Sequence, residues 1–225
     1  MKVLVLGASR GIGLEFVRQY TEAGDSVIST ARDDAGINRL KALGATAFKL
    51  DVADPKSVSG LDRQLGGEKI DVALYVAGVF PQAGARTPPT QDEFDRTLHT
   101  NVLGAMQAIP RVAPIVEAAG AGKGGKFVFI TSGMGQIAGV GSSHAWTYRV
   151  SKAALNMAVA AAQTDYPKAV MVAMSPGWVK TDMGGAGASL TVRQSVSAMR
   201  KAIASLTSKN RGAFLDYDGS PFKSW

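Results

Sequence analysis

Short apolar runs alternate with stretches of helical hydrophobic spacing along nearly the whole chain. Continuous apolar runs bounded by glycine, proline or polar residues are typical of strands buried on both faces of a parallel sheet. Such strands are expected at 2–6, 26–31, 45–50, 70–76, 126–131, 169–175 and 214–215. Helical spacing follows at 14–20, over 91–119, from Tyr148 onward and near 191–206. The alternation predicts an α/β fold in one domain, 1–225, with a Rossmann-type doubly wound parallel sheet of about seven strands and helices on both faces.

A glycine-rich turn links the first expected strand to the first helix and reads Gly7-Ala-Ser-Arg-Gly11-Ile-Gly13. Gly7 would permit the tight turn, Gly11 would let the backbone approach a pyrophosphate, and Gly13 would let the helix pack on the strand. The N–H groups of the helix would then point at the phosphates. The spacing is G-x-x-x-G-x-G and not G-x-G-x-x-G, so the turn indicates a dinucleotide site but is also compatible with an ordinary surface turn.

The end of the second strand is where we expect the choice of cofactor to be made. Arg32 stands there, and a guanidinium favours the 2′-phosphate of NADP, whereas an acid would hydrogen-bond the ribose hydroxyls of NAD. Arg10 in the glycine turn could add a second positive charge. Asp33 and Asp34 follow at once, and we place them in a turn beyond the strand. A slip of one or two residues would favour NAD instead.

Tyr148 and Lys152 are four residues apart at the start of a helical run, so they share one helix face. A nearby ammonium lowers the pKa of a phenol by favouring the phenolate, which makes the pair a candidate for proton transfer. Both residue types are also common on helix surfaces. Ser132 follows the fifth strand, at the edge where open parallel sheets bind ligands. Asn101 lies inside the long helical region, either as a local kink or as part of a polar relay.

Composition narrows the classes of function. The chain has 225 residues, no Cys, and only His99 and His144 as histidines, so disulfides, Cys nucleophiles and metal sites are not expected. The apolar run before Gly7 is too short for a signal peptide or a membrane span, which predicts a cytoplasmic protein without a membrane partner. The net charge of +7 is scattered and predicts no nucleic-acid partner, although the acid-free basic region 183–215 would favour an anionic cofactor.

Three further stretches have competing interpretations. The stretch 120–126 imitates a phosphate loop, but Phe127 stands where magnesium binding needs Ser or Thr, so we expect a connection between helix and strand. Asp51 could accept a hydrogen bond from adenine or cap a helix, although Asp54 is the better cap. The glycine-rich residues 184–189 predict a flexible part of a substrate loop.

Taken together, these motifs resemble the short-chain dehydrogenase/reductase family over nearly the whole chain, with small carbonyl reductases and C-signal-like proteins as the nearest members. The matches, in chain order, are the turn Gly7 to Gly13, Asp51, Asn101 in Asn-x-x-Gly, Ser132, Tyr148-x-x-x-Lys152, and Pro176-Gly177 with Thr181. Two stretches depart from the family. Leu6 stands where a Thr is usual, and Tyr75-Val76-Ala77-Gly78 replaces Asn-Asn-Ala-Gly, so we expect altered contacts around the adenine.

The resemblance implies NADPH-dependent reduction of a carbonyl compound, an aldehyde, ketone or quinone, with Tyr148 as general acid. The implied catalytic residues are Ser132, Tyr148, Lys152 and Asn101. The residues expected to bind NADP(H) are Gly7, Ser9, Arg10, Gly11, Ile12, Gly13, Arg32, Asp51, Val52, Ala77, Gly78, Tyr148, Lys152, Pro176, Gly177, Val179 and Thr181. The residues expected to line an apolar substrate pocket are Phe80, Met134, Trp146, Trp178 and Met183.

Other functions remain open at this point. A cofactor-binding sensor or signalling protein could use the same fold with little turnover, and an NAD-dependent alcohol dehydrogenase could use the same residues. A serine hydrolase is not expected, because it would need a Gly-x-Ser-x-Gly serine elbow together with a matched histidine. The alanines after Lys152 suit close packing against another helix, which is compatible with a homo-oligomer, either a dimer or a tetramer.

Overall fold

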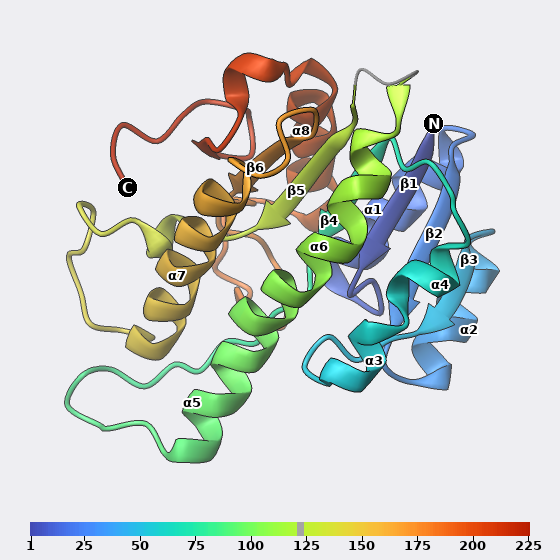
Figure 1. Cartoon of the computed structure of the whole chain (residues 1–225). Coiled ribbons are helices and arrows are strands. Elements are labelled where there is room, and N and C mark those ends of the chain that lie inside the picture. Colours follow the sequence, from blue (N-terminus) through green and yellow to red (C-terminus); the bar gives the residue numbers. More distant parts are fainter. Residues whose placement is uncertain (121–123) are drawn as a thin grey trace.

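The computed structural model describes residues 1–120 and 124–225, and its centre is a seven-stranded parallel sheet with the strand order β3-β2-β1-β4-β5-β6-β7 (Figure 1). The order reverses between β1 and β4, as in a doubly wound sheet. This confirms the predicted fold class. The strands are β1 (Lys2–Leu6), β2 (Ser26–Ala31), β3 (Thr46–Lys49), β4 (Val72–Tyr75), β5 (Lys126–Ile130), β6 (Val170–Met174) and β7 (Phe214–Leu215).

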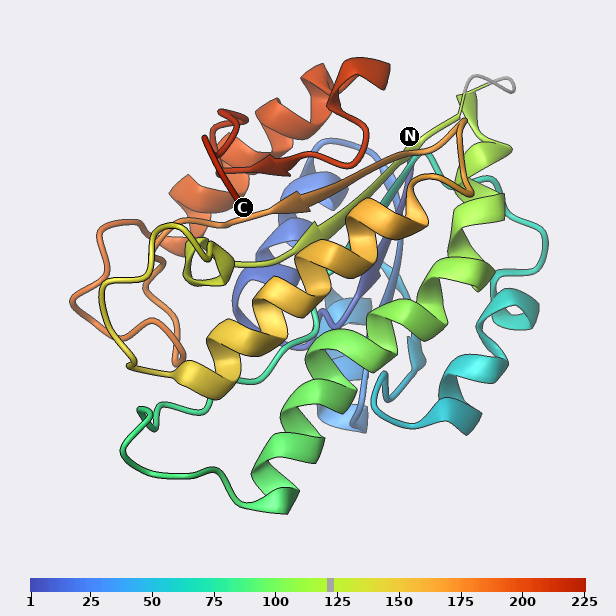
Figure 2. The ribbon, with the colours of Figure 1, turned by 60° about the vertical axis from the view of Figure 1, so that its left-hand side comes forward.

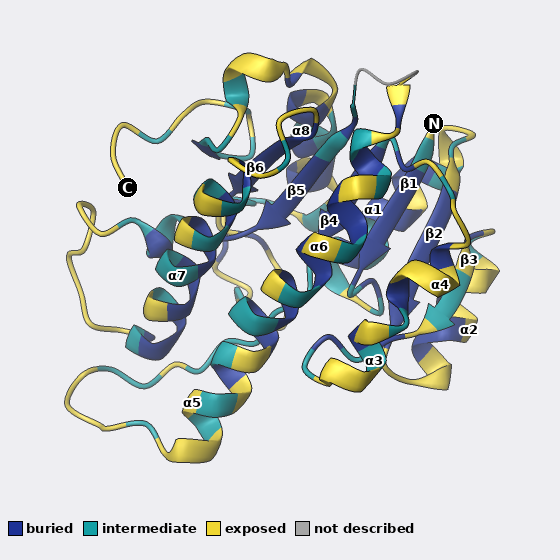
Figure 3. Cartoon of the chain, in the orientation of Figure 1, coloured by how far each residue is buried: buried dark blue, intermediate teal, exposed yellow. Residues whose placement is uncertain are grey.

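Helices cover both faces of the sheet (Figure 2). They are α1 (Gly11–Glu22), α2 (Asp34–Ala42), α3 (Pro55–Ser59), α4 (Leu61–Leu65), α5 (Gln91–Leu98), α6 (Gly104–Glu117), α7 (Trp146–Ala162) and α8 (Val192–Ser205). Alternate residues of β1 belong to two separate cores, because successive side chains of a strand point to opposite faces. Leu4 and Leu6 pack with α6 and α7, whereas Val3 and Val5 pack with α1, α2 and α8. Most strands are accordingly buried on both sides, whereas the edge strand β3 is partly exposed (Figure 3).

Polar side chains set the starts of several helices. Asp33 is the N-cap of α2, with a carboxylate oxygen 2.6 Å from the Gly36 amide, and Asp54 caps α3 at 3.0 Å from the Lys56 amide. Each accepts a hydrogen bond from a backbone N–H that lacks a partner within the helix. Asp54 is thus the cap that the sequence favoured. Asp33 lies beyond β2, as predicted, and its carboxylate is engaged with its own helix, whereas Asp34 is the first residue of α2 and does not lie in a turn.

The long helical region expected over 91–119 is interrupted at Asn101. A π-helical segment, His99–Leu103, joins α5 to α6. Such single-turn π segments shift the register of a helix and are frequent at functional sites. The sequence left open whether Asn101 marks a local kink or a polar relay. The helix is distorted at Asn101, and the Asn101 side chain also takes part in a polar network described below.

Two remaining expectations concern connections and membrane spans. The predicted connection over 120–126 does join a helix, α6, to a strand, β5, but its residues 121–123 lie outside the described residues. Within the described ranges, no helix is long and apolar enough to cross a bilayer.

Candidate active site

A cavity of about 400 Å³ opens at the carboxyl edge of the sheet. Its walls come from residues that follow six of the strands, because the carboxyl ends of parallel strands meet at one edge. Most residues expected to bind a cofactor line it, namely Gly7, Ser9, Arg10, Gly11, Ile12, Gly13, Arg32, Asp51, Val52, Ala77, Gly78, Tyr148, Lys152, Pro176 and Thr181. Gly177 and Val179 do not line it, since Gly177 faces Leu190 and Tyr217 and Val179 is buried.

The glycine turn has the geometry that a dinucleotide needs. Gly7 has φ +86°, and a Cβ added there would lie 2.7 Å from Ala77, while one at Gly13 would lie 2.4 Å from the Gly7 carbonyl oxygen. These two glycines therefore allow close packing of strand, turn and helix. A Cβ at Gly11 would meet only Thr181, at 3.6 Å, so the turn is open above the N-terminus of α1. The residues present fit a pyrophosphate at this position.

At the stretches where the sequence departs from the family pattern, other side chains form the hydrogen bonds that hold the turn and the neighbouring helix. The Gly7 amide donates to Thr30 Oγ1 at 3.1 Å, so a threonine of β2 holds the turn although position 6 is Leu. The Tyr75 hydroxyl is buried and donates to the Thr100 carbonyl at 2.7 Å. Tyr75 thereby fixes the π-helical segment from beneath, a role that its position in β4 did not suggest.

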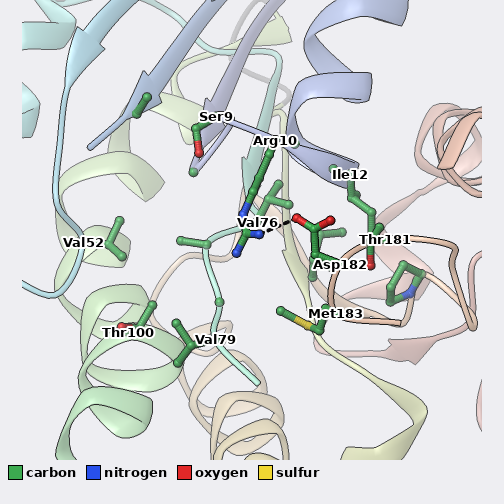
Figure 4. Close-up of a pocket in the computed structure, with 18 of the residues that line it drawn as sticks. Ser9, Arg10, Ile12, Val52, Val76, Val79, Thr100, Thr181, Asp182 and Met183 are labelled. Carbon is green, nitrogen blue, oxygen red and sulfur yellow. Dashed lines mark hydrogen bonds and ion pairs between the residues drawn. The ribbon is translucent and has the colours of Figure 1, made fainter. Parts of the chain in front are cut away.

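Arg10 and Asp182 face each other across the cavity (Figure 4). Their ion pair spans 2.6 Å between Arg10 Nη1 and Asp182 Oδ2, and both side chains are exposed. Arg32 lines the same cavity at the end of β2. Asp51 also borders it, with Oδ1 accepting from the Ala53 amide at 3.0 Å. Two guanidinium groups therefore border the space expected to hold the adenosine half of a nucleotide.

Tyr148 and Lys152 lie on the first two turns of α7 and are both buried, with exposed fractions of 6% and 3%. Burial raises the pKa of Tyr148 to about 12, and a hydrogen bond between the hydroxyls of Ser132 and Tyr148 opposes that rise. Burial lowers the pKa of Lys152 to about 7, and its Nζ donates to the Ile130 carbonyl at 2.8 Å. Lys152 Nζ is 5.5 Å from the centre of the Tyr148 ring. Burial therefore dominates, and the pKa of the phenol lies above its usual value, with Ser132 partly opposing the rise.

Asn101 is fully buried and connects three parts of the site. Its amide pairs with the backbone of Val79, Oδ1 accepting at 2.8 Å and Nδ2 donating at 3.0 Å. Nδ2 also donates to Ser151 Oγ at 2.9 Å, and that hydroxyl donates to the Tyr148 carbonyl at 2.7 Å. A Cβ at Gly78 would lie 3.5 Å from Asn101 Oδ1 and 3.7 Å from Lys152 Nζ, so these two polar atoms border the same space.

The residues expected around the substrate are only partly brought together. Phe80 packs edge-on against the Tyr148 ring, with centroids 4.7 Å apart, and Met183 lines the cavity. Met134 follows Ser132, and its amide donates to Ser132 Oγ at 3.1 Å. Trp178 is 60% exposed, and its Nε1 donates to the Gly184 carbonyl at 2.9 Å, so it holds the glycine-rich loop. Trp146 is half-buried and does not line the cavity.

Several cavity residues were missed by sequence reasoning. Lys180 and Asp182 flank Thr181, so their place just after β6 could have identified them. Thr131 follows β5 and directly precedes Ser132, which is a comparable signal. Val79 and Thr100 also line the cavity, and nothing in their local pattern indicates it.

The turn Gly7-Ala-Ser9-Arg-Gly11 also has the Gly-x-Ser-x-Gly spacing of a hydrolase nucleophile elbow, on a strand-turn-helix unit. A hydrolase would require a histidine within hydrogen-bonding reach of that serine. Neither His99 nor His144 lines the cavity. His99 is exposed in the π-helical segment, and His144 packs near Phe80 with ring centroids 6.1 Å apart. The geometry does not support this alternative.

Comparison with known proteins identifies the family of the chain. Residues 1–189 match the family model of the short chain dehydrogenases. The chain is 31% identical to a 1-hydroxy-2-glutathionyl-2-methyl-3-butene dehydrogenase of Rhodococcus sp. (strain AD45), over 99% of both chains. It is 37% identical to the C-signal of Myxococcus xanthus over 67% of this chain and 90% of that protein.

A solved structure of similar fold extends the comparison. The NADPH-bound carbonyl reductase from chicken fatty liver is 29% identical, with a TM-score of 0.87 over 100% of this chain and 94% of that one. Carbonyl reductases and the C-signal are thus among the relatives, as the sequence motifs indicated. With its glycine turn, its Tyr148-Lys152 pair and the match over most of its length, the chain belongs to the short-chain dehydrogenase/reductase family of oxidoreductases.

Proposed function

We propose that the protein reduces a carbonyl compound, an aldehyde, ketone or quinone, to an alcohol with NADPH as reductant. The observation that carries the proposal is the pair Tyr148 and Lys152, both buried, which line a cavity whose glycine turn fits a dinucleotide, with Ser132 acting on the pKa of Tyr148. A protein that only bound the nucleotide would have no need of a matched proton donor. The NADPH-bound carbonyl reductase of similar fold supports the same function.

The side chains of the site can perform the proton chemistry of such a reduction. A reduced nicotinamide cofactor, when bound, supplies the hydride that reaches the carbonyl carbon. Tyr148 would give its proton to the oxygen on which negative charge develops, and Ser132 would donate a hydrogen bond to the same oxygen. Lys152 would bind the ribose hydroxyls of the nucleotide, and its ammonium would then place a positive charge beside the reacting groups. Asn101, which borders the same space as Lys152 Nζ, would hold a water that returns the proton.

Preference for NADPH over NADH rests on the charges at the end of β2. Arg32 lines the cavity there, and Arg10 lies in the glycine turn. The acid nearest to the strand end, Asp33, caps α2 and is therefore engaged away from a ribose. A 2′-phosphate would meet two guanidinium groups at this position, and guanidinium is well suited to bidentate binding of phosphate.

The experiment that tests the proposal follows the consumption of NADPH and NADH with a panel of aldehydes, ketones and quinones, and identifies the alcohol product. Turnover that prefers NADPH supports the proposal. Tight binding of NADPH without turnover across the panel would instead support a sensor or signalling protein. Preferred oxidation of an alcohol with NAD would support an alcohol dehydrogenase. The oxidation assay is included because one relative is the dehydrogenase from Rhodococcus.

Three further expectations belong to the same proposal. The chain acts as one domain, and residues 184–189 form a flexible part of the substrate loop. A homo-oligomer is supported by the exposed apolar side chains of Met106 on α6 and of Val150 and Met157 on α7. Light scattering coupled to gel filtration measures the oligomeric state, and a monomer at all concentrations would contradict that expectation.

A further inference from the structure

The C-terminal segment, residues 222–225, lies against the stretch that follows Ser132. Figures 1 and 2 both place the C-terminus beside the loop that precedes α7. The Ala138 amide donates to the Trp225 carbonyl at 3.1 Å. Gln136 Nε2 donates to both the carbonyl and the hydroxyl of Ser224, each at 3.1 Å. These hydrogen bonds join two segments that are far apart in the sequence, since Gln136 and Ser224 are separated by 88 residues.

Aromatic stacking anchors the C-terminal segment to the sheet. Phe222 stacks on Phe214 of β7 with ring centroids 4.0 Å apart and an interplanar angle of 8°, and its amide donates to the Phe214 carbonyl at 3.0 Å. Trp225 lies on the same ring, with centroids 5.6 Å apart. Stacked aromatic pairs contribute about 0.5–1.5 kcal/mol beyond the area they bury. The segment is therefore fixed to the edge strand of the sheet.

The turn Gly133–Gly135, here called the serine turn, is held between this segment and α7. A Cβ at Gly133 would lie 3.5 Å from the Phe222 ring, and one at Gly135 would lie 2.9 Å from the Lys152 carbonyl carbon. The serine turn therefore packs on the C-terminal segment on one side and on the backbone of α7 on the other. Within it, the Met134 amide donates to Ser132 Oγ. A movement of the turn would consequently move the hydroxyl of Ser132.

We propose that the C-terminal segment is a positioning element for Ser132, and that Phe222 is its central residue. The segment acts through the serine turn: Phe222 holds Gly133, and the bonds to Gln136 and Ala138 hold the chain beyond it. The proposal rests on the proposed function in one respect, because the importance of Ser132 for turnover is assumed. It adds the claim that residues at the far end of the chain determine how well Ser132 is oriented.

The test replaces Phe222 by alanine and, separately, Gln136 by alanine, with Lys223→Ala as the matched control. Lys223 is exposed and lies in the same segment. In Phe222→Ala we expect kcat to fall by about 10- to 100-fold, the scale of a misplacement of about 1 Å, with NADPH affinity unchanged. Gln136→Ala should have a smaller effect in the same direction, and Lys223→Ala should behave as wild type.

Two readouts distinguish positioning from a general loss of structure. Amide hydrogen exchange at Met134 and Ala138 should become faster in Phe222→Ala, while exchange in α7 stays as in wild type. The second readout compares kcat with NADPH affinity: in Phe222→Ala only kcat should fall, whereas a general loss of structure would weaken both.

An unchanged kcat, or unchanged exchange at Met134, would overturn the positioning role. If Phe222→Ala is too unstable to measure, Phe222→Leu keeps the bulk of the side chain and is subject to the same criteria. If wild type turns over no carbonyl compound, the proposed function fails, and exchange at Met134 then decides alone: faster exchange supports the link between the two segments, and unchanged exchange refutes it.

Discussion

Replacing Lys152 by methionine should stabilise the cofactor-free protein while abolishing its activity. The Lys152 side chain is 3% exposed, and burial lowers the pKa of its ammonium from 10.5 to about 7. At neutral pH the unfolded chain keeps this proton in water at no cost, whereas the folded chain must bury the charge or release the proton. Methionine has a similar length and a similar helix propensity, and it carries no charge.

The size of the effect follows from the two pKa values. Their difference of about 3.5, at about 1.36 kcal/mol for each unit of pKa, corresponds to about 5 kcal/mol below pH 7 and about 4 kcal/mol at pH 7. The variant also loses the hydrogen bond from Lys152 to the Ile130 carbonyl, and a bond from a charged group contributes about 1.5–3 kcal/mol. The net gain at pH 7 is therefore about 1–3 kcal/mol.

The gain should depend on pH in a defined direction. Because the folded pKa is the lower one, the unfolded state binds more protons between pH 7 and pH 10.5, and wild-type stability rises with pH across that window. The advantage of Lys152→Met is therefore largest below pH 7 and shrinks as the pH approaches 10.5. At pH 7 the midpoint of thermal unfolding should rise by about 2–4 °C for each kcal/mol gained.

The assay is urea or thermal unfolding of wild type and variant without nucleotide, at pH 7 and at pH 9.5. Lys201→Met, at an exposed position of α8, is the control and should give no pH-dependent difference. A variant less stable than wild type at pH 7, or a difference in stability that is the same at both pH values, would refute the reasoning.

Two further predictions concern the cofactor. Arg32→Asp should lower the ratio of kcat/KM for NADPH over NADH by about 10- to 100-fold, because a bond from a charged group contributes about 1.5–3 kcal/mol; an unchanged ratio would exclude Arg32 as the phosphate ligand. Asp182→Asn should tighten NADPH binding by up to about fivefold at low ionic strength. The substitution removes the exposed ion pair with Arg10 and so frees that guanidinium for the nucleotide, and such pairs contribute about 0.2–1 kcal/mol. Fluorescence titration measures that affinity, and weaker binding would mean that Asp182 helps to hold the nucleotide.

Local patterns predicted the sheet well because each strand is a short apolar run with clear boundaries. β2 and β7 begin and end where the sequence indicated, at Ser26–Ala31 and Phe214–Leu215. The turn Gly7 to Gly13 and the helical spacing of Tyr148 and Lys152 likewise follow from neighbours in the chain. All of these features depend on interactions within about ten residues, where periodicity and turn chemistry are informative.

The features that the sequence did not reveal depend on residues far apart in the chain. Arg10 pairs with Asp182 at a separation of 172 residues, and Phe222 reaches Gly133 from the C-terminal segment. The direction of the Lys152 ammonium, toward the Ile130 carbonyl, is set by packing of α7 on β5 and has no local signature. Such contacts require the folded chain, because no local pattern records which side chains meet across the sheet.

The proposed function depends above all on Tyr148 as the proton donor. Its most direct test compares wild type and Tyr148→Phe in a single turnover with bound NADPH and a reducible carbonyl compound, with NADPH affinity measured by fluorescence in both. We expect the variant to bind NADPH nearly as well as wild type and its reduction rate to fall by about 10²–10⁴-fold, the usual contribution of a general acid. Reduction at the wild-type rate in Tyr148→Phe would show that another group supplies the proton and would rule out Tyr148 as the general acid.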